Sequence, residues 1–315
     1  MIVSTMAETP WGMLPVSDAH VHFFSHQFYS ALAKQGRWEN AEALAPILHW
    51  EIPIANAVSL AERWVAELDA RGVSRACLIA SIHGNEDCVA AAVAAYPNRF
   101  FGYFMVDPQQ ADARERVQAA ANNPHLHALC LFPAMHNFSL SDAQLVPLLE
   151  IAERQHLAVF VHCGVLGVGV RKKLGLPSPF DMRFSNPIDL HPVALRFPQV
   201  RFIVPHFGAG YFREALMLAD LCPNIWLDTS SSNHWMLYES LDLRAVFRRA
   251  LDLLGPNRLL FGTDSSFFPR GWQAPIFEQQ TTALYELGLS KQHAEQILSS
   301  NLEMLHQQRA DAAFA

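Results

Sequence analysis

Short apolar runs alternate with amphipathic stretches along most of the chain. Eight runs are rich in branched and aromatic residues and nearly continuous, as parallel strands buried on both faces are. They cover residues 14–22, 75–81, 100–107, 127–133, 157–163, 200–206, 225–230 and 258–264. Stretches with helical spacing separate them, at 57–72, 87–97, 111–123, 141–155, 186–198, 211–222 and 239–255, and two more follow the last strand, at about 275–288 and 291–308. Eight regular units predict an α/β fold, a single (β/α)8 TIM barrel, with a doubly wound open sheet as the alternative.

Two longer segments interrupt this rhythm, at residues 23–56 and 164–186. Each follows the carboxyl end of a predicted strand, which is the end where barrel enzymes build their sites. The sequence contains neither an internal repeat nor a linker between halves. We therefore expect one domain over 1–315, with loop insertions at the C-terminal face, each a candidate lid, and extra C-terminal helices.

Composition narrows the class of protein. The chain has 315 residues, of which 51% are hydrophobic and 17% charged, enough to bury a large core. Its net charge of −7 argues against nucleic acid or an anionic membrane as a partner. Five cysteines without a CxxC pair, together with an N-terminus that lacks a secretory pattern, predict a reduced, cytoplasmic protein.

Polar residues close the apolar run at four of the predicted strands. His20 and His22 end the first and face the same way, because alternate strand residues share a face. His162, His206 and Asp264 end the fifth, sixth and eighth strands, which a barrel brings together at one end. Imidazoles and a carboxylate predict one divalent metal, with zinc preferred and manganese as an alternative. These residues alone leave open whether His206 is a ligand or a base.

Four motifs carry a resemblance to a known family: DAHVH at 18–22, VHCG at 161–164, PHFGAG at 205–210 and FGTDSSF at 261–267. Together they resemble the amidohydrolase superfamily. The nearest branch is the amidohydrolase-related one, which includes aminocarboxymuconate semialdehyde decarboxylases, resorcylate-type decarboxylases and pyrone dicarboxylate lactonases. The likeness extends to an asparagine-containing C-terminal segment, ILSSNLEMLH at 297–306. The resemblance implies that the metal ligands are His20, His22, His162 and Asp264, and that the catalytic residues are His206 and Asp264.

Two departures from the superfamily narrow the reaction. Binuclear members carry a bridging Lys or Glu at the end of the fourth strand, whereas residues 127–133 contain neither, and Cys130 is interpreted as a core residue. The resemblance therefore implies one metal. Superfamily deaminases place a Glu three residues after the fifth-strand histidine, where this chain has Val165, which argues against a deaminase.

The substrate is expected to be a small anion, since the 164–186 segment carries Arg171, Lys172, Lys173 and Arg183 beside the predicted cation. The lysines fit a solvated surface equally well. Trp235 and Trp272 fit a pocket wall, the barrel rim or a subunit interface. The candidate substrate-binding residues are Arg183, Phe132, His136, Asn233, His234 and Arg270.

Three functional hypotheses follow. The first is a metal-dependent hydrolase, in which metal-activated water attacks a lactone, ester or amide carbonyl. The second is a metal-dependent non-oxidative decarboxylase of an aromatic or muconate-like acid, which would use the same residues. The third is a non-catalytic binding protein on the same barrel. The resemblance also suggests a homodimer.

Overall fold

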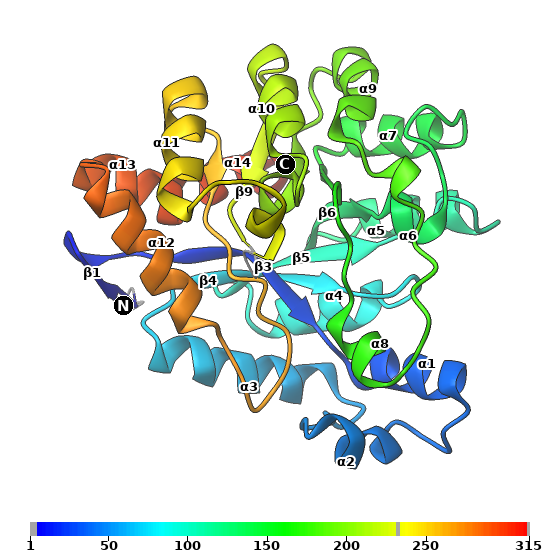
Figure 1. Cartoon of the computed structure of the whole chain (residues 1–315). Coiled ribbons are helices and arrows are strands. Elements are labelled where there is room, and N and C mark those ends of the chain that lie inside the picture. Colours follow the sequence, from blue (N-terminus) through cyan, green and yellow to red (C-terminus); the bar gives the residue numbers. More distant parts are fainter. Residues whose placement is uncertain (1–4, 231–233, 314–315) are drawn as a thin grey trace.

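A computed structural model describes residues 5–230 and 234–313, and its centre is a barrel of parallel strands (Figure 1). Within the described part of the chain, eight strands follow one another in sequence order around the barrel. They are β3 (Ser17–Phe23), β4 (Arg75–Ala80), β5 (Phe100–Met105), β6 (Leu126–Leu131), β7 (Ala158–Val161), β8 (Phe202–Val204), β9 (Ile225–Asp228) and β10 (Leu259–Leu260). The eight predicted strands are thereby confirmed.

The residues that follow β10 nearly close the sheet onto β3. The backbone N–H of Ala19 donates to the carbonyl of Phe261 at 2.8 Å, and that of His22 donates to the carbonyl of Ser265 at 2.8 Å. The N–H of Asp264 donates back to the carbonyl of His20 at 3.0 Å. The barrel prediction is confirmed and the open-sheet alternative is wrong.

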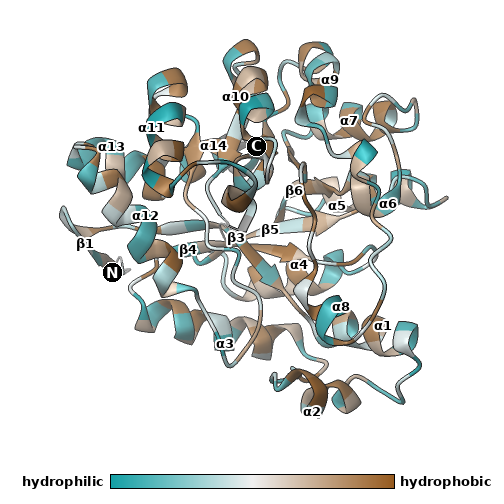
Figure 2. Ribbon diagram, viewed as in Figure 1, coloured by the Kyte–Doolittle hydropathy of each residue, from teal (hydrophilic) through white to brown (hydrophobic). Residues whose placement is uncertain are grey.

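Helices cover the outside of the barrel, one after most strands (Figure 1). The principal ones are α3 (Ala57–Ala70), α4 (Glu86–Ala95), α5 (Ala113–Ala121), α7 (Leu145–Arg154), α9 (His191–Arg196), α10 (Phe212–Leu221), α11 (Leu243–Leu254) and α12 (Ala274–Glu286). They carry both apolar and polar colouring in Figure 2, as helices with one buried face do. Side-chain caps begin two of them: Asn56 accepts from the N–H of Val58 and Ser59, and Asp242 accepts from that of Ala245.

The amino end of the barrel is covered by the C-terminal helix α14 (Asn301–Ala313), which follows the short α13 (Lys291–Glu295). Arg309 is buried there and donates to the carbonyls of Ala121, Asn123, Leu126 and Gln155. His306 lies 2.8 Å from the hydroxyl of Tyr103, measured to Nε2. The carboxyl end of the barrel, opposite this helix, is therefore the open end.

The two insertions pack against each other beside the barrel mouth. The 23–56 segment forms α1 (His26–Gly36) and α2 (Ala45–Leu48), and the 164–186 segment forms α8 (Gly169–Lys173). These helices lie together at one side of the molecule (Figure 1). Their buried side chains form an apolar cluster apart from the barrel core: Phe28, Tyr29, Leu32, Ala33, Ala41, Leu44, Leu48, Val170 and Leu174. The insertions therefore form one small cap with its own core.

The N-terminus and two tryptophans depart from the sequence-based expectations. Residues before the barrel form a hairpin of β1 (Ala7–Thr9) and β2 (Gly12–Leu14), which the apolar pattern did not indicate. Trp235 and Trp272 are only 5% and 3% exposed, so they are core residues and neither offers a surface to a second subunit. The indole of Trp272 instead donates to the buried Asp18 at 2.7 Å.

Within the described residues, no helix is both long and apolar enough to cross a membrane.

Candidate metal centre

Three of the predicted ligands meet at the carboxyl end of the barrel. His20 and His22 extend from the same face of β3, and Asp264 follows β10 on the neighbouring side. The Nε2 atoms of the two histidines are 3.4 Å apart. Oδ1 of Asp264 lies 3.7 Å from Nε2 of His20 and 3.3 Å from Nε2 of His22. Their ligating atoms all lie within 4.8 Å of one another. This spacing suits one shared cation.

Hydrogen bonds behind the two imidazoles set which nitrogen faces the cluster. Nδ1 of His20 donates to Oδ2 of Asp228 at 2.7 Å, since a carboxylate accepts only. Ser81 donates its hydroxyl proton to the carbonyl of Ile79, so it accepts from Nδ1 of His22 at 2.8 Å. Both Nε2 atoms therefore present lone pairs to each other and to a carboxylate. Such a set of facing acceptors is stabilised by a cation, so the residues fit a divalent metal.

The charges of the centre favour a bound cation. Burial lowers the pKa of His20, but the carboxylate of Asp228, helped by Asp264 and Asp18, outweighs it and raises that pKa. Burial raises the pKa of Asp264, yet the adjacent imidazoles of His22 and His20 outweigh it and hold that pKa well below its usual range. Asp264 therefore stays ionised. Its side chain is 31% exposed and that of His22 20%, so solvent reaches the centre from that side.

The backbone is bent at the points where the polar side chains enter the barrel mouth. Asp264 has a φ of 59° and His206 one of 57°, a left-handed region that non-glycine residues seldom occupy. Glycines allow neighbouring segments to come close. A Cβ on Gly164 would lie 2.1 Å from the carbonyl oxygen of Gly208, and one on Gly262 would lie 2.8 Å from Oδ1 of Asp228. The backbones of the loops after β7 and β8 therefore lie in direct contact.

His206 lies beside the centre with one nitrogen fixed. Its Nδ1 donates to the carbonyl of Ser230 at 2.9 Å, and its ring centroid is 4.9 Å from that of His20. Burial, followed by the charge of His20, lowers its pKa. His206 is therefore neutral at pH 7, with its proton on Nδ1 and the lone pair of Nε2 available.

His162 lies next to His206, outside the cluster of three. Its ring centroid is 5.3 Å from that of His206, and it stacks on Phe132 with centroids 5.4 Å apart. Burial holds its pKa well below the ordinary value, and its buried Nδ1 has no hydrogen-bond partner within the described part of the chain. Its role as a fourth ligand stays a prediction.

The predicted substrate-binding residues fall in different places. Phe132 lies against His162, as noted above. Arg270 is exposed and lies beside Asp264: its Nη2 donates to Ser266 and, at 3.3 Å, to the carbonyl of Asp264, and its guanidinium lies over the ring of Phe267. His136 is partly buried, at the end of a short helix, Pro133–His136, that follows β6. The side chain of Arg183 is 84% exposed and paired with Asp181.

Asn233 lies outside the described residues, as does the side chain of His234.

Sequence reasoning missed the residues that orient the ligands: Asp228, Ser230 and Ser81. Asp228 could have been found, because it closes the apolar run IWLD of the seventh strand, the same signal that singled out the other strand ends. It is fully buried and also accepts from the N–H of Ser230. The two serines had no distinguishing pattern.

A comparison with protein families matches residues 17–302 of the chain to the amidohydrolase family. Protein fluG of Emericella nidulans is 33% identical over 85 residues, a region that covers 27% of this chain and 10% of that protein.

Three solved structures with the same fold contain a metal, a carboxylic acid or both. One is 5-carboxyvanillate decarboxylase of Novosphingobium aromaticivorans with manganese and 4-hydroxy-3-methoxy-5-nitrobenzoic acid, at 15% identity, a TM-score of 0.64 and coverage of 98% of this chain and 99% of that one. A probable 2-pyrone-4,6-dicarboxylic acid hydrolase of Acinetobacter baumannii with citric acid has 15% identity and a TM-score of 0.61 over 93% of this chain and 100% of that one. An amidohydrolase of Burkholderia multivorans with zinc has 14% identity and a TM-score of 0.62 over 93% and 99%.

Proposed function

The chain belongs to the amidohydrolase family, and on that premise we propose that it is a metal-dependent hydrolase. It acts on a lactone, ester or amide bond of a small carboxylated substrate. One observation carries this proposal: the lone pairs of His20 and His22 converge with the carboxylate of Asp264 while the neutral His206 lies beside them.

A single divalent cation is proposed at this centre, held by His20, His22 and Asp264 with His162 as the fourth ligand. Zinc suits three imidazoles and a carboxylate, and manganese is the alternative. When bound, the cation would supply Lewis-acid activation of water and of the carbonyl.

The surrounding residues would handle the substrate and the protons. Asp264 orients the attacking water through Oδ2 and accepts its proton, because Oδ1 already faces the histidines. His206 shuttles a proton to the leaving group through Nε2, because Nδ1 is held by Ser230. Arg270 binds the substrate carboxylate. Its guanidinium makes no ion pair among the described residues and lies within hydrogen-bonding distance of the Asp264 carbonyl.

The experiment compares metal content and turnover in wild type and in a His20→Ala/His22→Ala variant. We expect about one metal per chain in wild type and none in the double variant, with His293→Ala as the exposed control. The metal-loaded wild type is then assayed on a panel of carboxylated lactones and esters. A chain that holds no metal, or that hydrolyses the panel equally well after chelation, would contradict the proposal.

A decarboxylase is the second candidate. The decarboxylase of Novosphingobium aromaticivorans carries manganese and an aromatic acid on the same fold. Arg270, which makes no ion pair among the described residues, could bind a carboxylate that is released as carbon dioxide, or one that stays on the substrate. Released carbon dioxide from aromatic acids, without hydrolysis of the lactones or esters, would select this reaction.

A further inference from the structure

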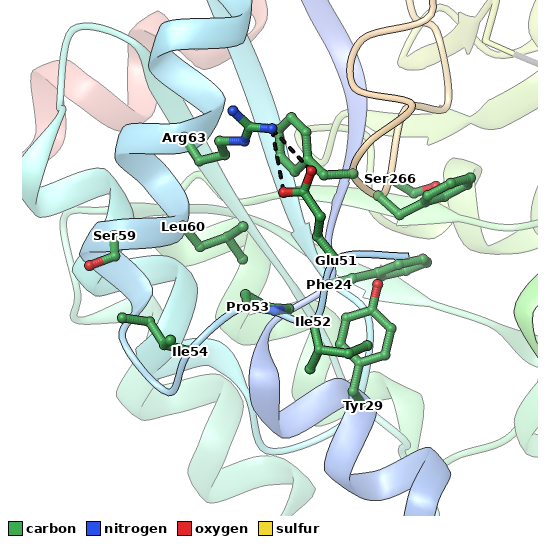
Figure 3. Close-up of a pocket in the computed structure, with 12 residues that line it drawn as sticks. Phe24, Tyr29, Glu51, Ile52, Pro53, Ile54, Ser59, Leu60, Arg63 and Ser266 are labelled. Atoms are coloured by element: carbon green, nitrogen blue, oxygen red, sulfur yellow. Dashed lines mark hydrogen bonds and ion pairs between the residues drawn. The ribbon is translucent and has the colours of Figure 1, made fainter. Parts of the chain in front are cut away.

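A pocket of about 130 Å³ lies beside the metal centre, between the 23–56 insertion, α3 and the loop after β10 (Figure 3). Two of the residues that line it lie close in sequence to predicted metal ligands: Phe24 is two residues after His22, and Ser266 is two residues after Asp264. The rings of His22 and Phe24 have centroids 5.5 Å apart. The pocket and the metal centre therefore share a wall.

The pocket is lined mainly by apolar side chains, among them Ile52, Leu60, Phe267 and Phe268. Phe24 is held in place by stacking on Phe28, with ring centroids 4.0 Å apart. An apolar cavity of about 150 Å³ is large enough to bind benzene. The size and lining of this pocket therefore fit one six-membered ring.

The charges on the pocket wall cancel. Nη2 of Arg63 lies 3.2 Å from Oε1 of Glu51, as Figure 3 shows, and the guanidinium also lies over the ring of Phe268, 4.6 Å from its centroid. Both charged side chains are 53% exposed, so they form the rim. A neutral ring suits such a wall better than a charged group does.

One polar side chain opens onto the pocket. Tyr29 lines the pocket, and its hydroxyl makes no hydrogen bond to any residue that the structure describes. The hydroxyl oxygen is not fully buried, so solvent in the pocket reaches it. Figure 3 shows the hydroxyl end of Tyr29 turned toward Phe24, and the two rings meet edge to face with centroids 6.2 Å apart. A hydroxyl that opens onto a pocket can exchange water for a polar atom of a ligand, so Tyr29 offers one hydrogen bond to a bound molecule.

We propose that this pocket binds a neutral six-membered ring of the substrate that carries a hydroxyl or carbonyl oxygen, hydrogen-bonded to Tyr29, while the scissile group lies at the metal centre. The placement of the scissile group rests on the proposed function, whereas binding of the ring does not.

Binding is tested with 4-fluorophenol and fluorobenzene on metal-free protein, observed by fluorine NMR. Wild type should bind 4-fluorophenol better than fluorobenzene, and Tyr29→Phe should weaken phenol binding about 2- to 10-fold while leaving fluorobenzene unchanged. Ile54→Trp, which fills the pocket, should weaken both probes, whereas the controls Tyr285→Phe and Ile47→Trp outside the pocket should not. Absence of binding, or binding that neither pocket variant changes, would overturn the proposal.

The link to the metal centre has a separate readout. Manganese loading should broaden the fluorine signal of bound 4-fluorophenol more than zinc loading does, because the probe lies one aromatic ring from His22. Equal broadening with both metals would show that the ring does not belong to the substrate. Failure of the chain to bind either metal would instead refute the proposed function, and ring binding to the metal-free protein would still be measured.

Discussion

Replacing Asp228 with asparagine is the sharpest test of how the metal centre is built. The carboxylate accepts from Nδ1 of His20 at 2.7 Å, and the two side chains are 0% and 1% exposed. Asparagine keeps the volume but removes the charge, and its amide can turn an N–H toward the imidazole. The expected result is a His20 ring that no longer keeps its Nε2 lone pair directed at the centre.

The magnitude follows from the burial of this pair. A hydrogen bond to a charged group contributes about 1.5–3 kcal/mol, which is about 10- to 100-fold in an equilibrium constant. Loss of a carboxylate that supports a metal-ligating histidine costs metal affinity by the same factor, about 10- to 100-fold. We therefore expect Asp228→Asn to bind zinc about 10- to 100-fold more weakly than wild type.

The assay is competition for zinc against a chromophoric chelator, with circular dichroism as a check on folding. Asp252→Asn, an exposed aspartate on α11, is the matched control and should bind zinc as wild type does. A folded Asp228→Asn protein with unchanged zinc affinity would refute the reasoning, because the orientation of His20 would then not depend on this carboxylate.

Three further results are expected. His206→Asn should lower kcat by about 100- to 10,000-fold while metal content stays at the wild-type level, a separation that metal analysis and steady-state kinetics can measure. Arg270→Gln should raise KM for a carboxylated substrate by about 10- to 100-fold, whereas the exposed Arg183→Gln should not. Burial lowers the pKa of His127 to about 3 and holds that of His306 well below its ordinary value, so below about pH 6.5 the unfolded chain takes up protons that the folded chain does not. The free energy of unfolding, measured with urea, should therefore decrease as the pH is lowered below about 6.5. In His127→Asn this dependence on pH should be shallower by about 1.4 kcal/mol per pH unit.

The barrel was predictable because each buried strand is a short apolar run and most runs are followed by a helical stretch. The cluster of His20, His22 and Asp264 was predictable because these residues close such runs and parallel strands bring their carboxyl ends together. Asp228 obeys the same rule, but it lies inside the predicted strand 225–230, two residues before its end, whereas Asp264 is the last residue of its run.

The 23–56 and 164–186 insertions were located from the sequence, but their internal structure was not. Their short helices and loops have no regular period, so nothing in the pattern showed that Phe28 and Leu48 pack against Val170 across more than 100 residues. The pocket beside the metal centre depends on that packing, because Tyr29 and Phe24 belong to the same cap.

Closure of the barrel imposes an order on the synthesis of the protein. Ala19 on β3 bonds to Phe261, so the first barrel strand must wait for about 240 further residues before its second neighbour exists. At about 5–20 residues per second on the ribosome, that interval is roughly 10 to 50 seconds. During it, a strand whose residues are almost all buried in the finished barrel has a free edge. Nascent chains are therefore most prone to aggregation late in translation, and slower, cooler expression with abundant chaperones should increase the yield of folded enzyme.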